Sequence, residues 1–283
     1  MPSLTLLGQS LLSGVLIGGL YGLLGLGLSL SWGLLRLINL AHFALVFLGA
    51  YLTYHLAGAF GISPFLAPLV IVPVFFVLGA ALQAAFTRFG VNELASLLVT
   101  FGITVVIESV IQWVWTADFR RLESPYATAS FRVGPLFLPV TELVMLLVAA
   151  ALSLATWAWL RFTWVGKAVR ASAEDPDIAA AFGVDHRRLA LLLSGVGAAY
   201  AGVAGTFVAL IYTLAPAQIY AWIGVVFAVV ILGGLGNPLG PVVAGVGIGI
   251  SEAITMAVTA PSWAPLVSFA LLILVLLLRP DRV

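Results

Sequence analysis

Two glutamates within long apolar stretches are the first candidates for chemistry. Glu108 is the only charged residue of the stretch 94–115, and Glu252 is the only charged residue of the stretch 242–258. A charge at the centre of a bilayer costs ~2.5–3.5 kcal/mol on insertion scales, so such residues are usually functional or paired. Three interpretations therefore remain for each glutamate: a place in a transport pathway, a neutral hydrogen bond between helices, or a position nearer the membrane surface.

Three uncharged polar residues join these glutamates as candidates. Asn39 and His42 lie three positions apart, so we expect them to share one helical face near the start of the second apolar stretch. Polar side chains at that depth must face protein or a cavity. The two residues either form a hydrogen-bonded pair or line a transport pathway. Thr100 lies on a turn near Glu108 and completes the candidate pathway set.

Motifs for enzymatic and metal chemistry are absent from the sequence. It contains no G-x-x-x-x-G-K-[ST], no H-E-x-x-H and no G-x-S-x-G. The three histidines, His42, His55 and His186, fall in separate segments, and there is no cysteine. We therefore expect no enzymatic activity, no catalytic or metal-binding residues and no cofactor bound by this chain. A membrane-embedded enzyme that assembles its site from distant helices remains an alternative.

The composition indicates a membrane protein. Hydrophobic residues make up 63% of the 283 residues and charged residues only 8%, whereas a soluble domain has about 25% charged residues. The net charge of +1 predicts no binding to nucleic acid. Glycine is frequent, with 29 residues, as expected where helices pack closely in lipid. Gly14, Gly18 and Gly22 recur at every fourth position and predict such a contact.

Apolar stretches separated by polar or Gly- and Pro-rich segments predict an all-α polytopic membrane protein. The expected spans are 11–32, 38–52, 65–86, 94–115, 140–160, 189–212, 222–235, 242–258 and 263–278. The segment 118–139 is predicted to be an irregular external loop. The GGLGNPLG segment at 233–240 is either a tight turn between spans or a broken helix beside the pathway.

Basic residues predict the orientation in the membrane. Arg36, Arg88, the loop 161–188 and Arg279 should all be cytoplasmic. A bundle of eight or nine transmembrane helices is expected. With nine, the N-terminus is external; if the second segment is re-entrant, the number falls to eight and the N-terminus is internal.

The longest polar interruption contains a short helix with both ends marked. Asp175 can cap its N-terminus, Pro176 suits the first helical position, and Asp177 favours the positive end of the helix dipole. Residues 178–182 carry the helix, and Gly183 suits its end. This segment is either a solvated connection or a helix on which a soluble partner pushes.

Four sequence segments together resemble one family. INLAHFALVFLGAYL, RASAEDPDIAAAFGV, VILGGLGNPLGPVVAG and the closing LLLRP are similar to permease subunits of bacterial branched-chain amino-acid ABC importers. The resemblance implies a single permease domain over 1–283 with a cytoplasmic coupling loop at 162–188. It implies that a coupling helix docks on an ATPase. The implied coupling residues are Asp175, Pro176, Asp177, Ala179, Ala180, Ala181, Phe182 and Gly183.

The resemblance also implies partners and a location. A second homologous permease, two ABC ATPase subunits and a periplasmic or lipid-anchored substrate-binding protein are expected, in the lipid of a bacterial plasma (inner) membrane. The chain would form the pathway for branched-chain or other hydrophobic amino acids, although urea, amides or aromatic acids fit the lining equally. The rival is a stand-alone proton-coupled secondary transporter in which Glu108 or Glu252 relays protons.

Overall fold

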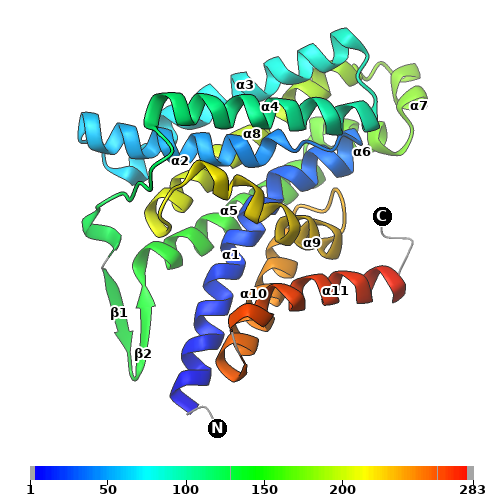
Figure 1. Ribbon diagram of the computed structural model, residues 1–283. Helices are drawn as coiled ribbons and strands as arrows, with labels where there is room; N and C mark the ends of the chain where they lie inside the picture. Colours follow the sequence, from blue (N-terminus) through cyan, green and yellow to red (C-terminus); the bar gives the residue numbers. More distant parts are fainter. Residues whose placement is uncertain (1–3, 128, 260, 279–283) are drawn as a thin grey trace.

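The chain forms a bundle of helices with one small β-hairpin (Figure 1). The structure, a computed structural model, describes residues 4–127, 129–259 and 261–278. Its α-helices are α1 (Leu4–Leu35), α2 (Ala41–Phe60), α3 (Pro68–Phe89), α4 (Glu93–Trp115), α5 (Val140–Phe162), α6 (Trp164–Glu174), α7 (Pro176–Ala181), α8 (His186–Ile211), α9 (Ile223–Gly233), α10 (Gly240–Val258) and α11 (Ala264–Leu278). The 3₁₀ helices are η1 (Pro64–Leu66), η2 (Pro125–Ala127), η3 (Pro216–Trp222) and η4 (Pro261–Trp263). The strands are β1 (Ser130–Val133) and β2 (Leu136–Pro139).

Most of the expected spans correspond to helices that are long enough to cross a membrane. Among the described residues, 8 helical segments are long and apolar enough, with η3 and α9 counted as one segment. The ninth, α11, has 15 residues. At 1.5 Å per residue it reaches about 22 Å, which is shorter than the ~30 Å hydrocarbon core. The prediction of an all-α polytopic membrane protein is therefore confirmed, and α2, with 20 residues, has the length of a full span rather than a re-entrant one.

The two ends of the bundle differ in what they carry. Figure 1 shows α6 and α7 at one end of α3, α4 and α8, while the hairpin and the start of α1 lie at the other. Hydrogen bonds support both groupings. Arg36, just after α1, donates from Nη2 to the carbonyl of Ala173 in α6 at 3.4 Å. At the opposite end Gln9 of α1 exchanges two hydrogen bonds with the backbone of Phe137 in β2, each 2.9 Å long.

Glycines bring α1 and α10 into backbone contact. A Cβ added at Gly14 would lie 2.7 Å from the carbonyl oxygen of Gly249, and one added at Gly245 would lie 2.5 Å from that of Gly18. The helices run antiparallel, so the predicted stripe of Gly14, Gly18 and Gly22 fits against Gly245 and Gly249 of α10. In lipid, where apolar burial gives little drive for helix association, close packing of small residues supplies much of the attraction.

Helix α8 is the second structural centre. It packs against α2 and α3, and most of its residues from Gly197 to Leu210 are buried. Gly49 of α2 faces Gly202 of α8, and a Cβ at Gly205 would collide with the backbone of α2. Thr53 and Thr206 hydrogen-bond between the same two helices at 3.1 Å. Small residues and a buried polar pair thus fix α8 within the bundle.

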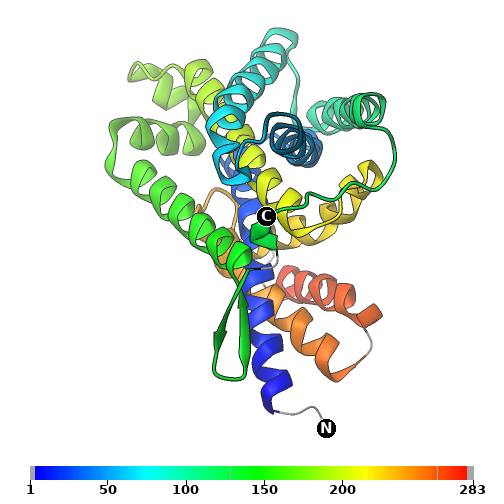
Figure 2. The ribbon, with the colours of Figure 1, turned by 90° about the vertical axis from the view of Figure 1, so that its left-hand side faces the viewer.

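Several local expectations were wrong. The loop 118–139 is not wholly irregular, because β1 and β2 form an antiparallel hairpin with Gly134 at positive φ in its turn; Figure 2 shows this hairpin beside α1. The polar loop contains a second helix, α6, which begins at a Thr163 cap whose Oγ1 accepts from the Gly166 N–H at 3.0 Å. The segment 216–233 changes from η3 to α9 at Trp222, an interruption that the sequence analysis did not predict.

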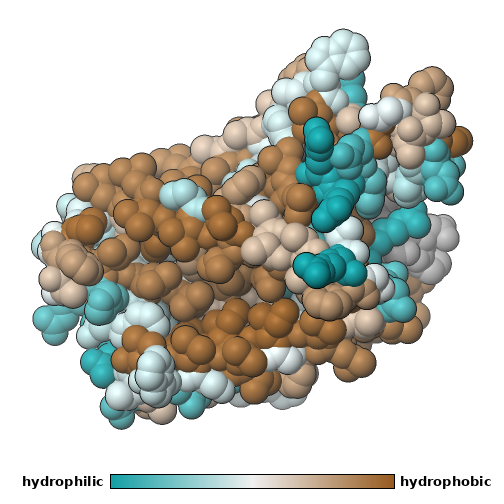
Figure 3. Space-filling view, turned by 90° about the horizontal axis from the view of Figure 1, so that it is seen from above, coloured by the Kyte–Doolittle hydropathy of each residue, from teal (hydrophilic) through white to brown (hydrophobic). Residues whose placement is uncertain are grey.

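The outer surface is consistent with a membrane environment. Figure 3 shows hydrophobic residues over the broad middle of one face, with hydrophilic residues gathered toward the ends. Large apolar side chains of α3 and α4 are exposed, including Leu69, Val77, Leu98 and Trp113. Because exposed apolar patches of this extent are rare on soluble proteins, we assign this face to contact with lipid.

The α1–α10 contact generates a stability prediction. Gly245→Ala should lower the free energy of unfolding by roughly 1–3 kcal/mol, because its methyl group overlaps the backbone of α1. Gly247→Ala in the same helix is the matched control, since nothing lies within 4 Å of a Cβ there. The measurement is the thermal unfolding midpoint in mild detergent. Equal midpoints for the two variants would contradict the described packing.

The orientation can be tested cleanly because the chain has no cysteine. Cysteines replacing Asp177 and Arg88 should react with an impermeant thiol reagent only from the cytoplasm, and a cysteine replacing Ser124 only from outside. The reason is that α7 and the end of α3 lie at the end of the bundle that carries Arg36, Arg88 and the segment 161–188, called here the basic end. The loop before β1 lies at the opposite end. External labelling at position 177 would reverse the orientation.

Candidate functional site

Glu252 lies in a small hydrogen-bonded cluster between three helices. It projects from α10 and is 8% exposed. The Tyr21 hydroxyl of α1 donates to its Oε2 at 2.8 Å. Ser268 of α11 donates to its Oε1. The close contact of α1 with α10 brings Tyr21 within reach, so the glycine stripe positions this cluster. The sequence singled out Glu252 but not its partners: Tyr21 is 231 residues away along the chain, and Ser268 is 16 residues away.

A cavity of about 590 Å³ opens at this glutamate. Its walls come from α1, the end of α8, η3, α9, α10 and α11. The Trp222 ring lies at the junction of η3 and α9, with ring centroids 6.2 Å from Tyr21 and 5.2 Å from Tyr212. Backbone that departs from regular α-helix at membrane depth is tolerated where it is buried in protein or lines a cavity. The helix interruption at Trp222 is therefore part of the wall of this cavity.

Glu108 lies near this cavity but does not line it. It is half-buried on α4, where Gln112 donates to its Oε1 at 3.2 Å. Tyr220 of η3 donates to its Oε2 at 2.7 Å. Because Tyr220 also lines the cavity, it connects Glu108 to the surroundings of Glu252. The structure thus places the two glutamates on either side of η3 and does not bring their carboxylates together.

Thr100 anchors the connection between α1 and α2. Its Oγ1 accepts from the Leu40 N–H at 3.0 Å and lies 3.3 Å from the Ile38 carbonyl. Asn39 lies in this connection, one residue before the turn that leads into α2, so the expected helical face shared with His42 is wrong. Its side-chain oxygen is buried without a hydrogen-bond partner, while its backbone carbonyl accepts from the His42 N–H at 3.3 Å.

His42 is a contact between helices. It is 2% exposed in the first turn of α2, and its Nε2 lies 2.9 Å from the carbonyl oxygen of Leu24 in α1. A Cβ added at Gly27 would lie 2.6 Å from the imidazole Cε1, so the ring fills the space that this glycine leaves. This geometry matches the interpretation of His42 as a hydrogen-bonded packing residue, although its partner is the backbone of α1 and not Asn39.

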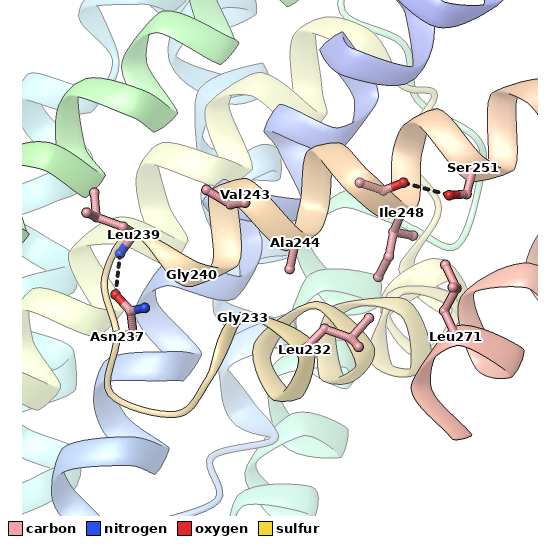
Figure 4. A pocket seen from close by; sticks show the side chains of 11 residues that line it. Leu232, Gly233, Asn237, Leu239, Gly240, Val243, Ala244, Ile248, Ser251 and Leu271 are labelled. Atoms are coloured by element: carbon pink, nitrogen blue, oxygen red, sulfur yellow. Dashed lines mark hydrogen bonds between the residues drawn. The ribbon is translucent and has the colours of Figure 1, made fainter. Parts of the chain in front are cut away.

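The GGLGNPLG segment forms a tight turn between α9 and α10. Figure 4 shows the chain reversing between Gly233 and Gly240, with the Leu239 N–H donating to Oδ1 of Asn237 at 3.1 Å. Gly236 donates its N–H to the Ser29 carbonyl of α1 at 3.2 Å. Beside the turn is a cavity of about 520 Å³ that lies between α9, α10 and α11 and has no charged residue in its lining. It offers no group that would recognise a charged ligand.

Helix α7 has the predicted caps. Oδ1 of Asp175 accepts from the N–H groups of Asp177 and Ile178, each at 3.0 Å. Pro176 occupies the first turn, and Gly183 adopts a φ of +85° just beyond the end. These are the interactions that end a helix at fixed residues. The short helix is therefore locally specified despite having only 6 residues.

The exposed side of α7 is more apolar than expected of a solvated loop. Phe182 is 85% exposed and Ile178 is 58% exposed. Ala180 and Ala181 are exposed beside them, but Ala179 is buried. Ala179 therefore packs inward within this chain, and its inclusion among the coupling residues stays a prediction. Ile178 was missed as a contact candidate; its one-turn spacing from Phe182 is the signal that could have identified it.

No metal centre is evident in the described part of the chain. Among those residues, no group of three or more His, Cys, Asp or Glu side chains is placed to hold a metal ion. The described sites consist of a buried carboxylate beside a cavity and an exposed apolar helix at the basic end.

Comparisons with known proteins identify the family. The model of the family described as "Branched-chain amino acid transport system / permease component" matches residues 10–276. The high-affinity branched-chain amino acid transport system permease protein LivH of Salmonella typhimurium is 26% identical over 97% of this chain and 94% of its own length.

Two further relatives agree. LivH of Escherichia coli strain K12 is 27% identical over 97% of this chain and 94% of its own length. The protein named probable branched-chain amino acid transport permease protein LivH of Methanocaldococcus jannaschii is 30% identical over 87% of this chain and 80% of its own length. No solved structure matches the chain. On the full-length family match and these relatives, the chain belongs to the permease family of branched-chain amino acid transport systems.

Proposed function

We propose that the chain is the translocation subunit of an ABC-type importer for branched-chain or other hydrophobic amino acids, powered by separate ATPase subunits. The relatives are named as permeases of branched-chain amino acid transport systems. The sequence contains no G-x-x-x-x-G-K-[ST] motif, so we expect separate subunits to hydrolyse ATP. The observation that carries the proposal is α7: a capped helix at the basic end that exposes Ile178 and Phe182.

The contacts of α6 and α7 support a role in transmitting force. Ser172 Oγ of α6 lies 2.6 Å from Nδ1 of His186, the first residue of α8. Arg36 joins α6 to the end of α1. Gly166 of α6 packs directly on the backbone of α5 at Leu160. A displacement of α7 would therefore be passed to α1, α5 and α8, which are spans of the bundle. Alternating access driven by ATPase closure needs a connection of this kind.

The proposal includes the rest of the assembly. A second homologous permease would complete the pathway, two ATPase subunits would bind at the α7 end, and a periplasmic or lipid-anchored substrate-binding protein would dock at the hairpin end. The chain would reside in the plasma (inner) membrane of a bacterium and bind no cofactor itself. Asp175, Pro176 and Gly183 would define the coupling helix, and Ala180 and Ala181 would allow close approach to an ATPase groove.

One observation favours a second candidate, a stand-alone proton-coupled carrier. Glu252 is a buried carboxylate, and no basic residue lines the adjacent cavity. A carboxylate that relays protons would have such surroundings. The two candidates differ in the energy source. In ATP-free vesicles that contain only this chain, we expect no accumulation of leucine under an inward proton gradient. Accumulation there would favour the carrier and contradict the importer.

The importer proposal predicts the effect of breaking α7. Ala180→Pro should disrupt the helix at a cost of about 3 kcal/mol or more, because it removes a backbone donor and clashes with the preceding turn. Ala180 is exposed and outside the spans, so the variant should insert normally. It should no longer co-purify with ATPase subunits in mild detergent, or should do so without substrate-stimulated ATP hydrolysis. Ala180→Ser, which keeps the helix, is the matched control.

Two outcomes would contradict this account. If Ala180→Pro binds the ATPase and turns over ATP as the control does, α7 is only a connection between α6 and α8. If the unmodified chain, purified from its native membrane, brings down no ATPase subunit, the importer assignment itself fails. Mass-spectrometric identification of the attached subunits distinguishes these results.

A further inference from the structure

We infer that the cavity beside Glu252 binds the ammonium group of the amino-acid substrate, with the Glu252 carboxylate as its counter-ion. The inference rests on the proposed function, because it assigns a substrate contact within the same permease. It concerns the recognition of one chemical group in the membrane-spanning part of the chain. Three properties of the cavity support it: the unpaired Glu252, the aromatic surface and the apolar walls.

The cavity lining offers no basic residue to pair with Glu252. None of the residues that line it is Lys, Arg or His, and the one salt bridge among the described residues joins Arg188 to Asp185 at the other end of the bundle. The Glu252 carboxylate accepts hydrogen bonds from Tyr21 and Ser268 only. A carboxylate offers about four acceptor positions, so positions remain for the donors of an ammonium group. A buried carboxylate is costly unless it is paired, and a bound cation would supply the missing partner.

Aromatic rings beside the carboxylate favour a cation over a neutral donor. Trp222 lies with its ring edge-on to both Tyr21 and Tyr212, and the three side chains line the same cavity. Ring faces attract ammonium groups, most strongly for tryptophan. The position of Trp222 follows from the change of η3 into α9 at that residue. The interruption of the helix thus places an aromatic surface next to the negative charge.

The remaining walls suit a branched apolar side chain. Val225, Met256 and Phe269 line the cavity together with the polar residues. Its volume of about 590 Å³ lies within the range of roughly 300–1,000 Å³ that is usual for small-molecule sites. The lining offers no cationic side chain to the substrate carboxylate. Recognition should therefore depend on the ammonium group and the apolar side chain, and not on the carboxylate.

A cysteine reporter tests this inference in the assembled importer. Met256→Cys places a single thiol in a cavity wall one turn beyond Glu252, where Met256 is 40% exposed. The rate of its reaction with a thiol reagent added from outside is measured with three compounds. Leucine has both charged groups, 3-methylbutylamine has the ammonium group without the carboxylate, and 4-methylpentanoate has the carboxylate without the ammonium group.

We expect leucine and 3-methylbutylamine to slow labelling and 4-methylpentanoate to leave it unchanged. Adding Glu252→Gln should weaken protection by about tenfold or more, as expected for the loss of a charge-assisted hydrogen bond. Adding Trp222→Leu should also weaken protection. Glu108→Gln is the matched control: it removes a carboxylate of the same bundle that does not line the cavity, and protection should persist. A Ser124→Cys reporter should show no ligand effect.

Protection by 4-methylpentanoate equal to that by leucine, unchanged protection in Glu252→Gln, or no protection by any compound would each overturn the inference. The comparison of the three compounds needs no Glu252 variant, so it remains decisive if that variant fails to fold. ATP-driven leucine uptake is measured in the same vesicles. Uptake by the unmodified chain without protection of the reporter leaves the importer intact and rejects only the ammonium site, whereas failure of uptake by the unmodified chain with all partners present rejects the proposed function.

Discussion

The close approach of α1 and α10 is the contact on which the site depends. Within lipid, apolar side chains gain little by leaving one hydrocarbon environment for another, so helices are held by fitted surfaces. Gly18 and Gly245 let the two backbones touch. Because the backbones are close, the Tyr21 hydroxyl can donate to the Glu252 carboxylate. Ser268 of α11 donates to the same carboxylate. The glycine stripe therefore decides the geometry of the buried carboxylate as well as the packing of the bundle.

Features that depend on neighbouring residues could be predicted from the sequence. The spans follow from runs of apolar residues, and the glycine contact follows from a four-residue repeat. The caps of α7 follow from Asp175 and Gly183, whose backbone roles are local. Helix α6 was not predicted, although Thr163 provides a recognisable N-cap for it.

Features that depend on contacts between distant segments could not be predicted. Tyr21 and Glu252 are separated by 231 residues, so no spacing rule joins them. Asn39 was placed on a helix because it lies three positions from His42. In the structure the Leu40 N–H donates to Oγ1 of Thr100 in α4, and this hydroxyl donates to the Ile38 carbonyl, so the segment is held as a connection. Tertiary hydrogen bonds here override local helix propensity. The interruption at Trp222 likewise depends on the cavity that it borders.

The two hydrogen bonds between Gln9 and Phe137 have a consequence for assembly. The side-chain amide of Gln9 donates from its Nε2 to the Phe137 carbonyl and accepts from the Phe137 N–H at its Oε1. It thereby substitutes for one peptide unit of a neighbouring strand. Unpaired strand edges recruit other chains, and this edge of β2 is already occupied at its centre. A partner that reaches the exterior of the protein therefore cannot extend the sheet at the centre of this β2 edge.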